Sequence, residues 1–252
     1  MSETRLYLNI PLYPDSVLDL PTEAARYMTR VLRLGTGMPL VLFNGQGGEF
    51  DAEVAEVRGQ AVAVCTRRYR DVDRESPLTL CLVQGISRGE RMDWVIQKAV
   101  ELGVSRIEPI FTARSVVRLN PERAARRLVH WRGIVVSACE QCGRNRIPEI
   151  TNPLPLSEWR NGECPARDVP NDLPGNRLLL QPGVERKLTD IEHTGGPVTL
   201  LVGPEGGLTQ AEIERAVAVG FIPIGLGPRT LRTETAPIAI LAAAQLRWGD
   251  FR

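Results

Sequence analysis

The sequence lacks the features that mark several broad classes of protein. No apolar run approaches the roughly 20 residues of a membrane-spanning helix. The beginning of the chain, MSETRLYLNIPLYPD, has no basic region followed by an apolar core, so no secretory signal is expected. The net charge is only +1, from 31 basic and 30 acidic residues. Any attraction to nucleic acid must therefore be local, and no membrane partner is predicted.

Cysteine and histidine are also scarce. The five cysteines are odd in number and scattered, which suits a reducing cytoplasm, and we expect a cytoplasmic protein. Cys139 and Cys142 have the spacing of a metal or redox pair. No second CxxC accompanies them, and the only histidines are His130 and His193. Because the pair also lies on a helical pattern, no metal site is predicted.

Residues 1 to about 72 are predicted to form a small β domain. Short runs with partial alternation, LYLNIPL, MPLVLFNG, GEFDAEVAEV and AVAVCTRRY, are broken by Gly, Pro and Asn. One helix, at about 22–34, interrupts them. Strands of this length and spacing indicate a compact barrel.

From residue 73 onward the pattern changes to alternating strands and helices. LTLCLVQGI is a continuous apolar run, typical of a strand buried on both faces. The remaining elements are predicted in the order ERMDWVIQKAVELG (helix), VSRIEPIF (strand), a helix opened by Asn120-Pro121, NRLLLQP (strand), VERKLTDIEH (short helix), PVTLLVG (strand), a helix with the capping box Thr209 to Glu212, FIPIGLG (strand) and a helix at 235–248. This alternation predicts an α/β domain with a parallel sheet. The segment 160–176, rich in Pro, Asp and Asn, is predicted to be a surface loop.

Two glycine turns follow two of these strands. The first glycine turn lies in LLVGPEGGL at 200–208, and the second lies in GLGPRTLRTE at 225–234. Ligands bind beyond the carboxyl ends of the strands in open parallel sheets, and glycine lets the backbone approach a ligand closely. Neither turn matches GxGxxG or GxxxxGK[ST], so a dinucleotide fold or an ATP-type phosphate loop is not predicted. The alternative is that each turn is an ordinary strand-to-helix connection.

LVGPEGGL together with LGPRTLRTETA resembles the RsmE family of RNA methyltransferases, within the SPOUT group. RGERMDWVIQKAVELGVSRIEPIFTARSV, EQCGRNRIPEI and RYMTRVLRLGTGMPLVLFNG resemble the same family. The resemblance covers nearly the whole chain apart from the loop at 160–176. It implies a PUA-like RNA-binding β-barrel over 1–72 and a SPOUT methyltransferase domain over 73–252. It also implies a trefoil knot at about 177–252, and a homodimer that the last helix helps to form.

The resemblance further implies that S-adenosylmethionine is the cofactor and 16S rRNA of the small ribosomal subunit the substrate. The methylated atom would be N3 of one uridine in the decoding region. Because N3 carries a proton, the protein should supply a carboxylate to accept it or orient its acceptor, and a cation for the oxygens of the uracil anion. Glu234 and Arg232 are the candidates, Arg232 for the uracil oxygens or the target phosphate. The alternative is that the two form a salt bridge that caps the last helix.

The two glycine turns would hold the cofactor. An adenine pocket is largely apolar and offers backbone hydrogen bonds. Glu205 is a second carboxylate candidate with a structural or cofactor-side role, and Thr233 and Thr235 are candidate helix caps or ligand contacts. The residues expected to line the cofactor site are Leu201, Gly203, Glu205, Gly206, Gly207, Ile224, Leu226, Gly227, Leu231, Thr235 and Ala236.

RNA contacts are expected from clustered arginines. Residues 114–146 hold eight Arg, including Arg118, against two Glu, a local net charge of +6. Most of those on the helix would equally suit a solvated face, whereas those in the GRNR turn are favoured as contacts. Arg26 stands where the family usually has His, and Arg88 where it often has Lys. The full set of RNA candidates is Arg26, Arg30, Arg33, Arg88, Arg91, Arg114, Arg144 and Arg146.

Two other functions remain open from the sequence. A non-catalytic RNA-binding or ribosome-assembly protein could keep the same fold, although both glycine turns are intact. A SPOUT enzyme that methylates a ribose 2′-hydroxyl would also place a base near the cofactor, and the family resemblance is the main reason against it.

Overall fold

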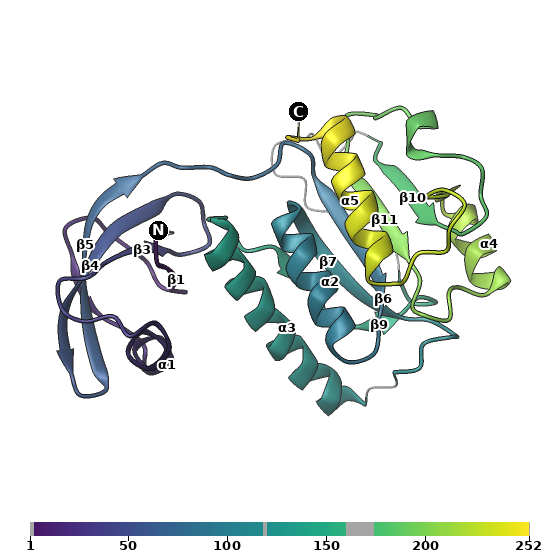
Figure 1. The fold of residues 1–252 in the computed structure, drawn as a ribbon. Coiled ribbons are helices and arrows are strands. Elements are labelled where there is room, and N and C mark those ends of the chain that lie inside the picture. Colours follow the sequence, from purple (N-terminus) through teal and green to yellow (C-terminus); the bar gives the residue numbers. More distant parts are fainter. Residues whose placement is uncertain (1–2, 118–119, 160–173, 252) are drawn as a thin grey trace. The chain divides into compact units, whose positions relative to one another are not determined.

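The computed structural model describes residues 3–117, 120–159 and 174–251 of the chain (Figure 1). The chain divides into two compact units. The N-terminal unit holds Met1–Glu75 together with Cys139–Ile147, and the α/β unit holds Ser76–Ala138 and Pro148–Arg252. The expected boundary lay three residues earlier and placed all of 139–147 in the second domain. Most of the predicted loop at 160–176 lies outside the described residues.

The N-terminal unit is built on a five-stranded sheet with the order β1-β3-β4-β5-β2. Its strands are β1 (Arg5–Tyr7), β2 (Val17–Asp19), β3 (Pro39–Phe43), β4 (Glu49–Arg58) and β5 (Ala61–Arg70). β1 pairs with β3 in parallel, and the other pairs are antiparallel. The four longer runs of the sequence predict four of these strands, whereas β2 is too short and exposed to stand out. No ladder joins β1 to β2 among the described residues, so closure into a barrel stays a prediction.

One helical segment packs on this sheet, as predicted, but it changes geometry partway along. α1 (Thr22–Tyr27) continues into a π-helical turn, Met28–Leu32, and the segment ends at Arg33, whose φ is 54°. Ala25 and Met28 are buried in the core of the unit. The basic residues expected on this segment therefore face outward, away from the core.

A fully buried carboxylate organises the N-terminal unit. Glu49, at the start of β4, is 0 % exposed and accepts hydrogen bonds or ion pairs from Arg5, Arg70 and Arg74. Burial by itself would raise the pKa of Glu49, but the hydrogen bonds from Arg5 and Arg74 lower it to about 2. The carboxylate is thus charged, and it ties β1 and β5 to the segment that leaves the unit. A buried charge is tolerated only with such a complete set of partners.

The α/β unit is built on a parallel sheet, as predicted. The order is β12-β10-β11-β6-β7-β8, with β9 also paired to β7, and every pair is parallel. The strands are β6 (Leu80–Gly85), β7 (Val104–Phe111), β8 (Glu149–Ile150), β9 (Leu154–Pro155), β10 (Asn176–Leu180), β11 (Val198–Val202) and β12 (Ile222–Ile224). β6 and β11 are buried at every position, which explains their continuous apolar sequences.

The helices α2 (Glu90–Glu101), α4 (Gln210–Ala218) and α5 (Thr235–Trp248) lie wholly in this unit. The helix α3 (Pro121–Cys142) begins in it, and its residues from Cys139 onward belong to the N-terminal unit. The predicted caps are confirmed, because Asn120 Oδ1 accepts from the N–H of Arg123 at 2.9 Å and Thr209 and Glu212 form a capping box. α2 and α5 lie side by side over the sheet (Figure 1). The trefoil knot expected over about 177–252 stays a prediction.

The short helix predicted from VERKLTDIEH is wrong. Only a single 3₁₀ turn forms there, at Leu188–Asp190. The preceding residues are held by the second glycine turn instead, since the N–H of Gly225 donates to the carbonyl of Arg186 at 2.8 Å. A backbone bond to a distant segment has replaced the local helical bond.

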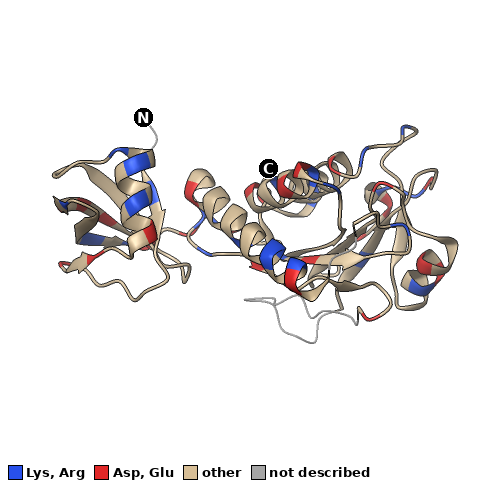
Figure 2. Ribbon diagram, turned by 90° about the horizontal axis from the view of Figure 1, so that it is seen from below, with Lys and Arg blue, Asp and Glu red and all other residues tan. Residues whose placement is uncertain are grey.

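The surface charge of both units is mixed. Figure 2 shows basic and acidic residues distributed along the ribbon of each unit, in agreement with the net charge of +1. Within the described part of the chain, no helix is both long enough and apolar enough to cross a membrane.

The buried ion network predicts an acid-sensitive N-terminal unit. The pKa of Glu49 is about 2 in the folded unit, against an ordinary value of about 4.3 in an unfolded chain. The ionised Glu49 side chain therefore stabilises the unit fully at a pH above its ordinary pKa of about 4.3, and this stabilisation is lost as the pH falls toward 2. Glu49→Gln should destabilise the unit by about 3 kcal/mol at pH 7, because it removes the carboxylate partner of Arg5, whose side chain is only 8 % exposed.

The predicted loss of stability is measured by hydrogen exchange of the β4 and β5 amides, corrected for the intrinsic effect of pH on exchange. The matched control is Glu53→Gln on the same strand, whose side chain is 42 % exposed and whose loss should cost less than about 1 kcal/mol. Amides of β6 and β7 provide an internal reference. Equal protection in Glu49→Gln and Glu53→Gln would contradict the assignment.

Candidate functional site

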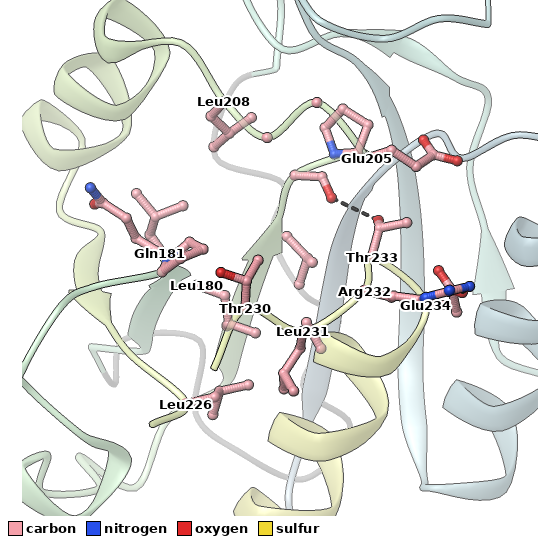
Figure 3. Close-up of a pocket in the computed structure, with 18 of the residues that line it drawn as sticks. Leu180, Gln181, Glu205, Leu208, Leu226, Thr230, Leu231, Arg232, Thr233 and Glu234 are labelled. Carbon is pink, nitrogen blue, oxygen red and sulfur yellow. Dashed lines mark hydrogen bonds and ion pairs between the residues drawn. The ribbon is translucent and has the colours of Figure 1, made fainter. Parts of the chain in front are cut away.

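The α/β unit contains a pocket of about 710 Å³ at the carboxyl ends of three adjacent strands, β10, β11 and β12 (Figure 3). Both glycine turns and the beginning of α5 contribute to it, together with one arginine from α2 and one from the segment after β7. The lining residues are Arg91, Arg114, Leu179–Pro182, Val202–Leu208, Ile213, Ile224, Leu226, Gly227, Arg229–Glu234 and Ala236. The strand-end position is where parallel sheets bind ligands.

The first glycine turn is braced from outside. Gly207 has a φ of 67°, which favours glycine, and its N–H donates to the carbonyl of Pro204 at 2.8 Å. Arg114 donates from Nη1 to the carbonyls of Gly206 and Leu208, at 3.1 and 3.3 Å. A Cβ on Gly206 would lie 2.9 Å from the Cβ of Arg114. The close approach of this arginine therefore requires glycine at 206.

The second glycine turn is joined to the first by Thr233. This buried residue donates from Oγ1 to the carbonyl of Gly203 at 2.9 Å, the bond drawn in Figure 3. The Oγ of Ser87 lies 3.2 Å from the same hydroxyl, and the amide of Gln84 donates to it at 3.4 Å. One side chain thus connects both turns with the end of β6. Neither Thr233 nor Thr235 caps α5, because the residue at the N-cap is Glu234 and no side-chain cap bond forms there.

Two carboxylates approach one guanidinium beside the pocket. Glu205 Oε1 accepts from Arg91 Nη1 and from the N–H of Arg88, both at 3.0 Å. Glu234 Oε1 lies 3.9 Å from Arg91 Nε and also 3.9 Å from Arg232 Nη1. Partial burial would raise the pKa of Glu205, but the bonds from Arg88 and Arg91 lower it. Glu205 is therefore held as a carboxylate.

Glu234 is much less completely satisfied. Its side chain is 16 % exposed, and its Oε2 atom is buried with no hydrogen-bond partner among the described residues. The 3.9 Å separations are too long for hydrogen bonds. Arg232, at 78 % exposure, extends toward solvent beside it. The Glu234–Arg232 salt bridge, the alternative left by the sequence, therefore forms at the beginning of α5 only as a long ion pair of 3.9 Å, without a side-chain cap bond.

The structure brings most of the predicted cofactor residues to this pocket. Nine of them line it, namely Gly203, Glu205, Gly206, Gly207, Ile224, Leu226, Gly227, Leu231 and Ala236, and so do Glu234 and Arg232. Two expectations are corrected. Leu201 is fully buried in the core that packs against α4, and Thr235 is exposed on the first turn of α5, outside the lining.

The end of β10 and the two residues after it also contribute to the pocket, which was not expected from the sequence. Leu179, Leu180, Gln181 and Pro182 line the pocket, and so do Arg229 and Thr230 from the second glycine turn. The sequence does contain the apolar strand NRLLLQP, which ends in a turn. This strand end could be assigned to the pocket only once the strand order was known, because that order places β10 between β12 and β11.

The expected RNA contacts fall into three groups. Arg91 and Arg114 line the pocket, and Arg88 is exposed next to it. In the N-terminal unit Arg26, Arg30 and Arg33 are exposed.

The expectation that Arg144 contacts RNA is corrected. Arg144 is only 4 % exposed and its guanidinium pairs with Glu75, so it offers little surface to a phosphate. Arg146 is half-buried. Arg118 lies outside the described residues.

Cys139, the first cysteine of the Cys139 and Cys142 pair, is buried. Burial raises the pKa of the Cys139 thiol to about 12, which keeps it protonated and unreactive. Within the described ranges, no cluster of three or more His, Cys, Asp or Glu side chains is placed to hold a metal ion.

Comparison with known families assigns both parts of the chain. An RNA methyltransferase domain matches residues 74–245, and an RNA methyltransferase PUA domain matches residues 20–64. The first match covers more than half of the chain and contains every residue that lines the pocket. The second falls within the β-rich N-terminal unit.

Individual relatives agree over nearly their whole length. Ribosomal RNA small subunit methyltransferase E from Buchnera aphidicola subsp. Schizaphis graminum is 36 % identical over 246 residues, which are 98 % of this chain and 97 % of that protein. The Bacillus subtilis protein of the same name is 29 % identical over 93 % of both chains.

Structural similarity extends equally far. The crystal structure of a ribosomal RNA small subunit methyltransferase E from Neisseria gonorrhoeae, bound to S-adenosylmethionine, has a TM-score of 0.90, 38 % identity and full coverage of both chains. The similarity thus extends over both units of the chain. The chain belongs to the RsmE family, the family of ribosomal RNA small subunit methyltransferase E.

Proposed function

We propose that this protein is an S-adenosylmethionine-dependent methyltransferase of 16S rRNA in the small ribosomal subunit. The observation that carries the proposal is the pocket beyond β10, β11 and β12, formed by both glycine turns in a chain 38 % identical throughout to an S-adenosylmethionine-bound relative. A non-catalytic assembly protein would have no need to keep this pocket.

The pocket has the chemical character that the cofactor requires. Ile224, Leu226 and Leu231 offer apolar surface, while the glycine turns expose backbone donors and acceptors to a bound adenine. When bound, the cofactor supplies a sulfonium-activated methyl group. The protein's part is to hold this group and the acceptor atom in line, which is where most of the rate gain from orientation arises.

We propose N3 of a uridine in the decoding region as the acceptor. The proton on N3 must leave before its electron pair can attack, so a carboxylate is needed within hydrogen-bonding reach. Glu234 lines the pocket, its side chain is 16 % exposed, and its carboxylate lacks a complete set of hydrogen-bond partners, so it is the candidate acceptor of this proton. Arg232 is close enough to stabilise the charge that develops on the uracil oxygens.

RNA binding should depend on exposed arginines of each unit. Arg88 and Arg114 stand at the pocket, and Arg26, Arg30 and Arg33 are exposed on the N-terminal unit. Such contacts would position the RNA through its phosphates and make binding salt-dependent. A paired target base would also have to be flipped out of its helix to expose N3.

We also propose a homodimer formed with the help of α5. This helix is apolar nearly all round, yet only Pro237, Ile240, Leu241, Ala244 and Gln245 are buried within the chain. Leu246 is 64 % exposed. An apolar helix face left open in this way suits contact with a second copy.

The reaction product tests the proposal directly. Incubation with methyl-labelled S-adenosylmethionine and small subunits that lack the modification should place label in N3-methyluridine, found by nucleoside analysis of the 16S rRNA. Label in a ribose-methylated nucleoside would replace the proposal with 2′-O-methylation. No transfer at all would favour the RNA-binding or assembly alternative.

Glu234→Gln tests the role of the carboxylate. The substitution keeps the size of the side chain but removes its ability to accept a proton, so kcat should fall by roughly 100-fold or more. Calorimetry should show unchanged affinity for S-adenosylmethionine. The control is Glu214→Gln on the exposed face of α4. Turnover of Glu234→Gln equal to that of the control would exclude a catalytic role.

Thr233→Val tests whether the connection between the turns shapes the cofactor pocket. The substitution keeps the volume but removes the donor to Gly203, leaving a carbonyl unsatisfied, which costs about 1 to 3 kcal/mol. Affinity for S-adenosylmethionine should fall by about 10-fold, the equivalent of about 1.4 kcal/mol. Thr235→Val is the matched control, because Thr235 lies outside the lining. Equal affinities of the two variants would show that the bond does not matter for binding.

A further inference from the structure

Arg91 lies between two carboxylates that come from different segments. It is in the first turn of α2, whereas Glu205 belongs to the first glycine turn and Glu234 is the last residue of the second. Its Nη1 atom donates to Glu205 Oε1 at 3.0 Å, and its Nε atom is 3.9 Å from Glu234 Oε1. The planar fork of arginine presents its donors to two acceptors in a fixed geometry, whereas the ammonium donors of lysine rotate at the end of a flexible stem.

The contact with Glu205 fixes the position of Arg91. Glu205 is itself held by the N–H of Arg88 at 3.0 Å, and its pKa is lowered by Arg88 and Arg91 against the effect of burial. Arg91 is therefore anchored to an ionised partner. Such a guanidinium is a poor candidate for a phosphate contact, because the phosphate would have to compete with a carboxylate already in place.

The two cations beside Glu234 differ in how firmly they are held. Arg232 is 78 % exposed, while Arg91 is 45 % exposed and anchored by Glu205. Both face the same oxygen, Oε1, and leave Oε2 buried without a partner. Only the anchored cation can define the direction of the carboxylate.

We propose that Arg91, anchored by Glu205, is a positioning residue that orients the Glu234 carboxylate at the pocket. The inference rests on the proposed role of Glu234 in methyl transfer. In this proposal Arg91, expected from the sequence to contact RNA, instead orients a side chain of the protein. Glu205 acts on Glu234 only indirectly, by holding Arg91.

Steady-state kinetics of Arg91→Met and Glu205→Gln test the proposal. Both variants should lose kcat by about 10- to 100-fold, the usual effect of a displaced catalytic group. KM for small subunits should stay at the wild-type value, and kcat is measured at saturating S-adenosylmethionine because Arg91 and Glu205 also line the cofactor pocket. Arg91→Lys, which keeps the charge but lacks the fork, should fall between Arg91→Met and wild type. Arg215→Met, an exposed charge loss on α4, is the matched control.

Glu205→Gln separates this proposal from a phosphate contact. If Arg91 bound RNA, removing its anionic partner would free it, so RNA affinity would stay equal or rise and kcat would not fall. Arg91→Met would then raise KM and reduce the slope of log K against log salt concentration by about 0.9. That pattern, or unchanged kcat in both variants, would overturn the proposal. Thermal melts of each variant confirm that folding is intact, and Glu205→Gln, nearly isosteric, stays informative if Arg91→Met does not fold.

The same assays distinguish this failure from failure of the proposed function. If the wild type forms N3-methyluridine and only KM changes in the variants, the positioning role alone is wrong. If label enters another nucleoside, the proposed acceptor is wrong, and the kcat ratios still decide whether Arg91 orients the site. No transfer by the wild type would overturn both.

Discussion

The candidate site depends on one hydrogen bond between segments thirty residues apart, from the Thr233 hydroxyl to the carbonyl of Gly203. A glycine turn has few side chains with which to hold its own shape, so its geometry must come from neighbours. Thr233 provides it for both turns at once, and the bonds with Gln84 and Ser87 extend the connection to β6. The pocket is thus shaped by a buried polar cluster rather than by apolar packing alone.

Each unit contains a carboxylate with little exposed surface, Glu49 in one and Glu234 in the other, and the two differ in their hydrogen-bond and ion-pair partners. Glu49 is surrounded by Arg5, Arg70 and Arg74, and its charge is fully compensated. Glu234 has cations near only one of its oxygens and leaves the other without a partner. The first arrangement stabilises a fold, whereas the second leaves a group ready to interact with something that is not part of the chain. This contrast, rather than the number of charges, is what sets the candidate site apart.

The sequence predicted the elements that depend on local patterns. The continuous apolar strands β6 and β11, the Asn120 cap of α3 and the Thr209 capping box of α4 are all in place. It failed where a distant segment overrode the local pattern. The stretch before Leu188 was read as helix, but its backbone is bonded to Gly225. Arg144 was read as a surface contact, but Glu75 pairs with it in the interior of the N-terminal unit.

Composition and periodicity were enough to predict an α/β protein with a β-rich N-terminal part and two glycine turns, at 200–208 and 225–234, as candidate ligand sites. The resemblance to the RsmE family added the expectation that these turns hold the cofactor. Only the tertiary structure decided that β10 lies between β12 and β11, which adds Leu180 and Gln181 to the pocket. It also decided that Arg91 faces two carboxylates. Strand order and ion pairing are set by contacts between segments far apart in the chain. A local pattern of residues does not predict which distant segments will be in contact.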